Sequence, residues 1–122
     1  MSSPPMIAVV DDDEAMRDAL SELLQVLSME CHTFERAEAF LAAYSPDSFD
    51  CLITDLRMPG MSGMKLIWEL KALGSRLPVV VITSSMEAES RSEAIAAGAF
   101  AYLTKPVGEE LLTRTLNAAL SR

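Results

Sequence analysis

Four short apolar runs, each ended by polar residues or by proline, constrain the fold of this chain more than any other feature. They lie at residues 7–10, 51–54, 79–82 and 101–103. Because the apolar residues in these runs do not alternate with polar ones, both faces of each strand are expected to be covered by other elements, as in parallel sheets. A fifth and more polar strand is expected over residues 30–34.

Amphipathic helical patterns separate these runs. The clearest pattern places on one helical face Met16, Ala19, Leu20, Leu23, Leu24 and Leu27. Further helices are expected over residues 37–44, 64–73, 88–97 and 112–120. Gly98 is expected to end the fourth helix as a left-handed cap. Strict alternation of strands and helices predicts an α/β fold, a doubly wound five-stranded parallel sheet of strand order 2-1-3-4-5 with helices on both faces.

The composition fits one compact domain and argues against several classes of partner. The chain has 122 residues, of which 50% are hydrophobic, and carries a net charge of −8, which opposes attraction to nucleic acid and to anionic membranes. Its apolar runs are far shorter than the ~20 residues of a membrane helix, and the N-terminus lacks a signal-peptide pattern. We therefore expect a cytoplasmic protein with a disordered lead-in at residues 1–5 and one domain at residues 6–121.

Several common catalytic and metal-binding motifs are absent from the sequence. Cys31 and Cys51 form no CxxC pair and His32 is the single histidine, so neither a zinc cluster nor a Cys- or Ser-based triad can be assembled. Both thiols are expected to pack in the core. No glycine pattern matches a dinucleotide-binding or P-loop motif. The remaining chemistry must therefore come from carboxylates.

Polar side chains follow the expected strands at the points where these end. These side chains are Asp11 and Asp12 after the first strand, Asp55 after the third, Thr83 after the fourth and Lys105 after the fifth. The carboxyl ends of parallel strands meet at one edge of the sheet, where ligands bind in doubly wound folds. Three crowded carboxylates repel one another and raise at least one pKa unless a cation lies between them. Oxygen ligands of this kind suit Mg²⁺.

Asp55 is the candidate nucleophile of this cluster. It stands alone after a central strand, and a carboxylate needs no base before it attacks phosphorus to form an aspartyl phosphate. Phosphoryl transfer depends mainly on positioning and charge neutralisation, which the Lys105 ammonium and the Thr83 hydroxyl are expected to supply together with the metal. Pro106 follows Lys105, and a cis bond between them would form a tight turn that points the ammonium inward.

Four segments of the chain, VVDDDE, LITDLRMPGMSG, VVVITSS and YLTKP, occur in the order and spacing of receiver domains of two-component response regulators. The chain resembles this family over residues 6–121, and the segments LRMPGMSG and AEAFL are most similar to FixJ-type regulators. The resemblance implies the flavodoxin-like, CheY-like receiver fold. It also implies that Asp55 accepts a phosphoryl group from a histidine kinase or a phosphotransfer protein of a bacterial two-component system.

The resemblance further implies a set of metal ligands and the geometry of one peptide bond. Asp12, Asp55 and the backbone carbonyl of Arg57 would bind Mg²⁺, for which Mn²⁺ can substitute. Asp11 would reach the metal through water. The bond before Pro106 would be cis.

The phosphoryl contacts and the switch residues also come from the resemblance. Thr83 and Lys105 would contact the phosphoryl group, and Tyr102 would swing inward when Thr83 moves. Arg57 and Ser85, two residues beyond the acceptor and the threonine, would tune the lifetime of the phosphate.

The fourth helix, over residues 88–97, is the element expected to respond to phosphorylation. A phosphoryl group adds about two negative charges, which matter only where an element has two nearly balanced arrangements. Ile95 is the main large apolar anchor of this helix, so its docking should be weak. We expect a homodimer or an output domain to bind the face that it forms with the fifth strand and the fifth helix. Such an output domain would begin beyond Arg122, unless the chain is a stand-alone receiver.

Two other classes of function fit part of the pattern. A phosphohydrolase of the haloacid-dehalogenase type would use Asp11 and Asp13 as nucleophile and acid. Such an enzyme requires another acidic metal-binding motif after Lys105, where the chain has two glutamates and no Asp. A receiver-shaped interaction module that never takes phosphate would have lost an acidic residue or the lysine, and none is missing. We expect a phosphoacceptor that catalyses its own phosphorylation and slow dephosphorylation rather than a turnover enzyme.

Overall fold

The computed structural model describes residues 4–84 and 87–121, in which strands and helices alternate. The strands are β1 (Met6–Val10), β2 (Glu30–Phe34), β3 (Cys51–Thr54), β4 (Val79–Thr83) and β5 (Ala101–Thr104). The helices are α1 (Glu14–Val26), α2 (Ala37–Ala43), α3 (Gly63–Ala72), α4 (Ala88–Ala97) and α5 (Glu109–Leu120). Each predicted strand and helix is present, and the differences lie at the element ends. Of the predicted lead-in at residues 1–5, residues 1–3 lie outside the described part, and the Pro5 carbonyl accepts a hydrogen bond from the Glu30 amide (2.8 Å).

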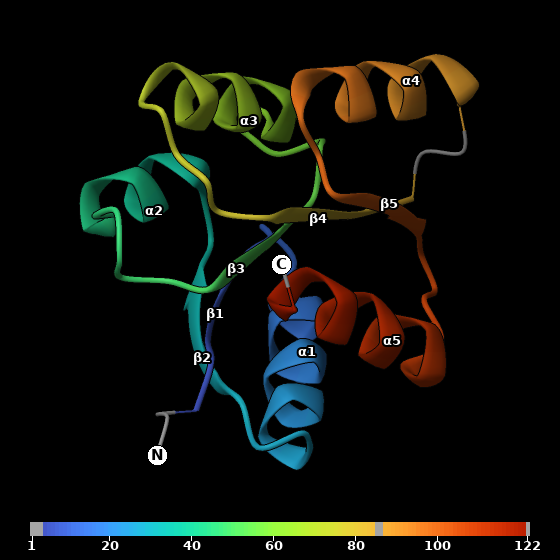
Figure 1. Ribbon diagram of the computed structural model, residues 1–122. Helices are drawn as coiled ribbons and strands as arrows, with labels where there is room; N and C mark the ends of the chain where they lie inside the picture. Colours follow the sequence, from blue (N-terminus) through green and yellow to red (C-terminus); the bar gives the residue numbers. More distant parts are fainter. Residues whose placement is uncertain (1–3, 85–86, 122) are drawn as a thin grey trace.

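The strands pair in parallel within one sheet. The strand order is β2-β1-β3-β4-β5, which confirms the predicted doubly wound topology. Helices α1 and α5 cover one face of the sheet, and α2, α3 and α4 cover the other (Figure 1). Successive side chains of a strand point to opposite faces, so each central strand serves two cores. In β1, Ile7 and Val9 lie in the core under α1 and α5. Ala8 and Val10 lie in the core under the other three helices.

Polar residues and glycine fix the ends of several helices. Asp13 precedes α1, and its side chain accepts a hydrogen bond from the Ala15 amide (3.0 Å). Ser62 precedes α3 and accepts from the Lys65 amide (3.1 Å) in the same way. Gly98 ends α4 with φ at 116°, in the left-handed region that favours glycine, which confirms its predicted role as a cap. Residues 11–13 and 55–62 form the loops that lead from β1 and β3 to the capped helices.

Two large apolar residues, one on α3 and one on α4, are exposed. Trp68 on α3 is 53% exposed and Ile95 on α4 is 46% exposed. The prediction that Ile95 is the main apolar anchor of α4 is therefore wrong. The helical period turns both positions away from the sheet. The buried residues of α4 are Ala94 and Ala97, so this helix meets the core through small side chains.

The two cysteines are both free thiols, and they differ in burial. Cys51 is fully buried, and burial raises the pKa of its thiol to about 12. Cys31 is half-buried, and burial raises its pKa as well.

Because the thiolate is the reactive form, we expect iodoacetamide at about pH 8 to leave Cys51 unmodified in the folded protein and to modify Cys31 slowly. Peptide mass spectrometry checks this, with labelling in denaturant as the control; faster labelling of Cys51 than of Cys31 would contradict it.

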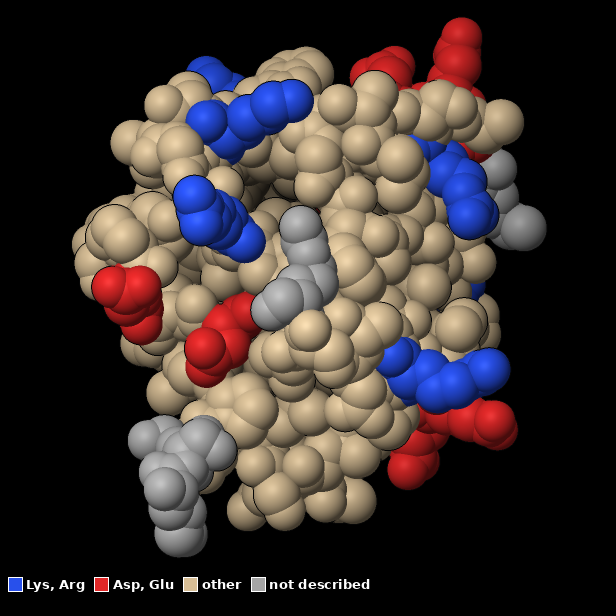
Figure 2. All heavy atoms as spheres, viewed as in Figure 1, with Lys and Arg blue, Asp and Glu red and all other residues tan. Residues whose placement is uncertain are grey.

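Charged side chains of both signs occur on the face drawn in Figure 2, with wide uncharged areas between them. The net charge of −8 is therefore not gathered into one acidic patch on that face. Within residues 4–84 and 87–121, no helix combines the length and the apolar character needed to cross a bilayer.

Candidate functional site

Asp11 and Asp55 lie side by side because β1 and β3 are neighbours in the sheet. Each residue directly follows its strand, and both strands end at the same edge. The Asp55 amide donates a hydrogen bond to the Val10 carbonyl (3.2 Å), which extends the ladder one residue beyond β3. On the other side of β1, the Asp11 amide donates to the Phe34 carbonyl at the end of β2 (3.1 Å). The sheet itself therefore fixes the backbone of both acidic residues.

Asp12 completes a group of three carboxylates. One carboxylate oxygen from each of Asp11, Asp12 and Asp55 lies within 4.8 Å of the other two, which confirms that the acids crowd at this edge. Asp11 is 2% exposed and Asp55 is 7% exposed, whereas Asp12 is exposed to solvent. Mg²⁺ binds through one or two carboxylates and keeps several of its waters. A set of hard oxygen donors that is open to solvent at Asp12 fits this requirement.

Lys105 connects the two buried carboxylates. Its ammonium nitrogen lies 2.8 Å from Oδ2 of Asp55 and 3.1 Å from Oδ2 of Asp11. The Lys105 amide donates to the carbonyl of Thr83 (2.8 Å), so β4 holds the backbone of the lysine beside the site. The peptide bond between Lys105 and Pro106 is cis. The predicted cation thus lies directly against the predicted nucleophile.

The charges of this group are only partly balanced. Burial raises the pKa of Asp11, and this outweighs the hydrogen bonds from the Asp13 amide and from Lys105 that lower it. Burial on its own would lower the pKa of Lys105, but hydrogen bonds and charge interactions with Asp55 and Asp11 reverse the direction and raise it. Lys105 therefore stays protonated at neutral pH. The Arg17 guanidinium contacts the backbone carbonyl of Asp11 (2.7 Å) rather than its carboxylate, so Lys105 is the cation paired with these carboxylates, and a further cation can be accommodated.

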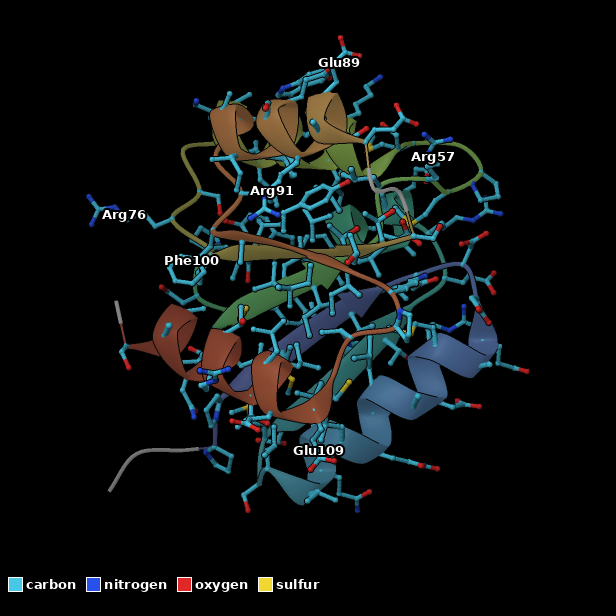
Figure 3. All side chains as sticks on the ribbon, turned by 90° about the vertical axis from the view of Figure 1, so that its right-hand side faces the viewer. Arg57, Arg76, Glu89, Arg91, Phe100 and Glu109 are labelled. Atoms are coloured by element: carbon cyan, nitrogen blue, oxygen red, sulfur yellow. The ribbon has the colours of Figure 1, made fainter. Side chains whose placement is uncertain are left out.

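Thr83 and Tyr102 lie on the same face of the sheet. Thr83 pairs with Thr104 and Val81 pairs with Tyr102, so these four side chains share the face that α4 covers. Thr83 and Tyr102 are both buried. The Arg91 guanidinium of α4 lies 6.0 Å from the centre of the Tyr102 ring, between the helix and β5 (Figure 3). The tyrosine that the resemblance expected to swing inward thus already lies inside in this structure, whereas Ser85 lies outside the described residues.

Arg57 reaches two partners from the loop after β3. Its amide donates to Oδ1 of Asp55 (3.2 Å), the carboxylate oxygen that is not bonded to Lys105. Its guanidinium forms an ion pair with Glu87, the residue that precedes α4 (2.9 Å). The predicted metal contact of the Arg57 carbonyl stays a prediction. Glu87 was not among the residues predicted for the site.

Gly63 is a second residue that sequence reasoning missed. A Cβ atom at this position would overlap the backbone carbonyl of Asp55 and would lie 2.8 Å from the Cα of Leu56. The Gly63 amide also donates to the Leu56 carbonyl (2.9 Å). The first residue of α3 therefore packs directly against the backbone of the acidic residue. The sequence shows that Gly63 is the last residue of the segment LRMPGMSG, but only the folded chain shows which atoms it contacts.

The fold and the acidic edge define a class of protein. A family model described as the response regulator receiver domain matches residues 7–117, and the chain belongs to this family. It is a receiver domain of two-component response regulators, a signalling domain, and its cluster of acids fits a phosphoacceptor role.

Its relatives include FixJ proteins. The chain is 37% identical over 120 residues to the transcriptional regulatory protein FixJ of Bradyrhizobium diazoefficiens, which covers 98% of this chain and 58% of FixJ. It is 37% identical over 115 residues to the response regulator protein TodT of Pseudomonas putida, which covers 94% of this chain and 51% of TodT. The crystal structure of FixJ-N matches with a TM-score of 0.89 at 33% identity, over 100% of this chain and 97% of that one. These matches confirm the FixJ-type resemblance, and the chain spans little more than half of the length of these curated relatives.

Proposed function

We propose that Asp55 is the phosphoacceptor of a receiver unit formed by residues 6–121, with residues 1–5 as a lead-in. The observation that carries this proposal is the Asp55 carboxylate, which lies among two other acids and 2.8 Å from the Lys105 ammonium. A buried carboxylate with a cation against one oxygen is held in a fixed position, and the cation offsets the repulsion from its acidic neighbours.

The proposed step is transfer of one phosphoryl group. An oxygen of Asp55 forms a bond to phosphorus while the P–N bond of a phosphohistidine breaks, and the released imidazole takes up a proton. With acetyl phosphate, the P–O bond breaks and acetate leaves. Lys105 offsets charge on the transferred oxygens, and the Thr83 hydroxyl donates to one of them. The chain is then modified once and loses the group slowly by hydrolysis.

The metal that receiver domains bind would be held by Asp12, Asp55 and the Arg57 carbonyl, with Asp11 acting through water. When bound, Mg²⁺ or Mn²⁺ neutralises charge on the oxygens of the phosphoryl group. Lys105 contacts both Asp11 and Asp55 in the structure, so the indirect role of Asp11 follows from the resemblance and not from this contact. Asp12 is exposed, so a direct metal contact would replace water at its carboxylate.

Phosphorylation is proposed to act on the face formed by α4, β5 and α5. Thr83 and Tyr102 lie on the same face of the sheet, beneath α4. Movement of the threonine would therefore change the position of the Tyr102 ring and, through it, of Arg91 on α4. Arg57 and Ser85 would tune the lifetime of the phosphate. A histidine kinase or a phosphotransfer protein is the proposed donor, and homodimerisation or contact with an output domain is the proposed result. We place this regulator in the cytoplasm, where free thiols such as Cys51 persist.

Incubation with acetyl phosphate tests this function. We expect the folded chain with Mg²⁺ to gain the mass of one phosphoryl group, and borohydride reduction followed by peptide mapping to locate it on Asp55. Continued release of phosphate from simple phosphoesters would instead indicate a phosphohydrolase of the haloacid-dehalogenase type. A folded chain that gains no mass would indicate an interaction module that takes no phosphate.

Replacement of Asp12 tests the metal ligands. We expect Asp12→Asn to weaken Mg²⁺ binding by about tenfold or more, because a neutral amide replaces a direct oxygen ligand. Isothermal titration calorimetry measures the affinity. The matched control is Asp13→Asn, which removes the same charge from the next residue and keeps a side chain that can cap α1. Equal loss of affinity in both variants would show that Asp12 acts only through its charge.

A further inference from the structure

The ion pair between Arg57 and Glu87 joins two loops at the edge of the site. Arg57 lies in the loop after β3, and Glu87 lies in the segment between β4 and α4. The Arg57 Nη2 atom is 2.9 Å from Oε1 of Glu87, and the two residues are 30 positions apart in the chain. The strands β3 and β4 are neighbours and lead to Asp55 and Thr83, respectively. The pair therefore spans the two loops that border the space beside the proposed acceptor.

Arg57 is tied to the acceptor by its backbone and to Glu87 by its side chain. Its amide donates to Oδ1 of Asp55 at 3.2 Å, so the start of its side chain cannot move far from the site. The guanidinium extends outward beside the start of α4 (Figure 3). The side chains of Arg57 and Glu87 are 68% and 62% exposed. Because both side chains are largely exposed, the arginine can change rotamer without displacing packed neighbours.

Lys105 is held more firmly than Arg57, because its ammonium has two buried partners. Lys105 contacts both Asp55 and Asp11, whereas Arg57 contacts one exposed carboxylate. A phosphoryl group offers about two negative charges and several acceptor oxygens in a geometry that matches a guanidinium. A single carboxylate of Glu87 offers one charge. The phosphoryl group is thus the stronger partner for Arg57 as it arrives on Asp55.

We propose that Glu87 is a positioning residue that holds the Arg57 guanidinium away from the phosphoryl group and so limits the rate at which Asp55 is phosphorylated. This inference rests on the proposed function of Asp55. An incoming donor must draw Arg57 away from Glu87 before the arginine can neutralise charge on the transferred oxygens. Because exposed ion pairs are weak and are screened by salt, the restraint is modest and reversible.

Removal of the Glu87 charge provides the test. We expect Glu87→Gln to raise the rate constant for phosphorylation by acetyl phosphate at low donor concentration by about twofold to fivefold, since the released arginine becomes available to the phosphoryl group. The matched control is Glu89→Gln, which removes the same charge from a side chain that points away from the molecule (Figure 3). Phosphorylation is followed by mass spectrometry in low and in high salt, and the gain should shrink in high salt.

A second pair of variants separates this role from a general change in charge or fold. In an Arg57→Gln background, Glu87→Gln should have no more effect than Glu89→Gln, because the arginine that it releases is absent. Both Glu87→Gln and Glu89→Gln should unfold cooperatively with stabilities close to that of the parent, because an exposed ion pair contributes little to stability. Equal rates for the two single variants, or a Glu87→Gln gain that persists without Arg57, would overturn the inference. Failure of the parent chain to take up phosphoryl at all would overturn the proposed function instead.

Discussion

The Asp55→Asn variant is expected to take up no phosphoryl group from acetyl phosphate in the presence of Mg²⁺. The amide has nearly the shape of the carboxylate, but its oxygen is a poor nucleophile and it carries no charge for Lys105 or for a metal to hold. The variant loses the ion pair at 2.8 Å to Lys105 and relieves repulsion from the two neighbouring acids. These effects oppose each other, so we expect the free energy of unfolding to change by no more than about 2 kcal/mol.

Intact mass spectrometry measures the modification, and denaturant unfolding measures the stability. Asp13→Asn serves as the matched control, since it lies at the same edge but outside the group of three carboxylates, and it should be phosphorylated like the parent. Labelling of Asp55→Asn to the same extent as the parent would show that another residue is the acceptor.

Gly63→Ala is expected to have the second largest effect. The atoms that a Cβ would meet belong to the backbone of Asp55 and Leu56, so no flexible side chain can turn aside. Either the start of α3 or the end of β3 must shift, which we expect to lower the free energy of unfolding by about 1–3 kcal/mol. A shift of the Asp55 backbone also displaces the nucleophile, and a displacement of about 1 Å can slow a reaction by about a hundredfold.

Gly108→Ala is the control for this substitution. Gly108 precedes α5 with φ at −73°, and a Cβ there would meet nothing within 4 Å. It should cost less than about 1 kcal/mol and leave phosphorylation near the parent rate. If Gly63→Ala matched Gly108→Ala in both stability and rate, the contact between α3 and Asp55 would not constrain the site.

The fold was predictable because the sequence pattern and the burial agree. Residues 79–82 are apolar without a break, and the whole of β4 is buried, as a central parallel strand requires. The start of α5 was less predictable, since its first turn is Glu109 and Glu110 and carries no apolar period. The exposure of Trp68 was not predictable, since residue type alone does not show which side of α3 faces the sheet.

The acidic cluster was predictable because it depends only on strand order. Asp11 and Asp55 each directly follow a strand, and adjacent parallel strands must bring such residues together. Glu87 and Gly63 were not predictable in this way. Their contacts depend on how the loops and the first turns of α3 and α4 pack against the sheet. No local sequence pattern predicts the distance between two loops.

The alanine contacts of α4 affect how easily this helix can change its position on the sheet. Ala94 and Ala97 have no side-chain rotamers, so displacement of the helix along the sheet needs no repacking of interlocked side chains. One side-chain contact that must reform is the one between Arg91 and the Tyr102 ring. Two positions of α4 can therefore differ little in free energy, and a binding partner with only a modest preference for one of them can decide which is populated.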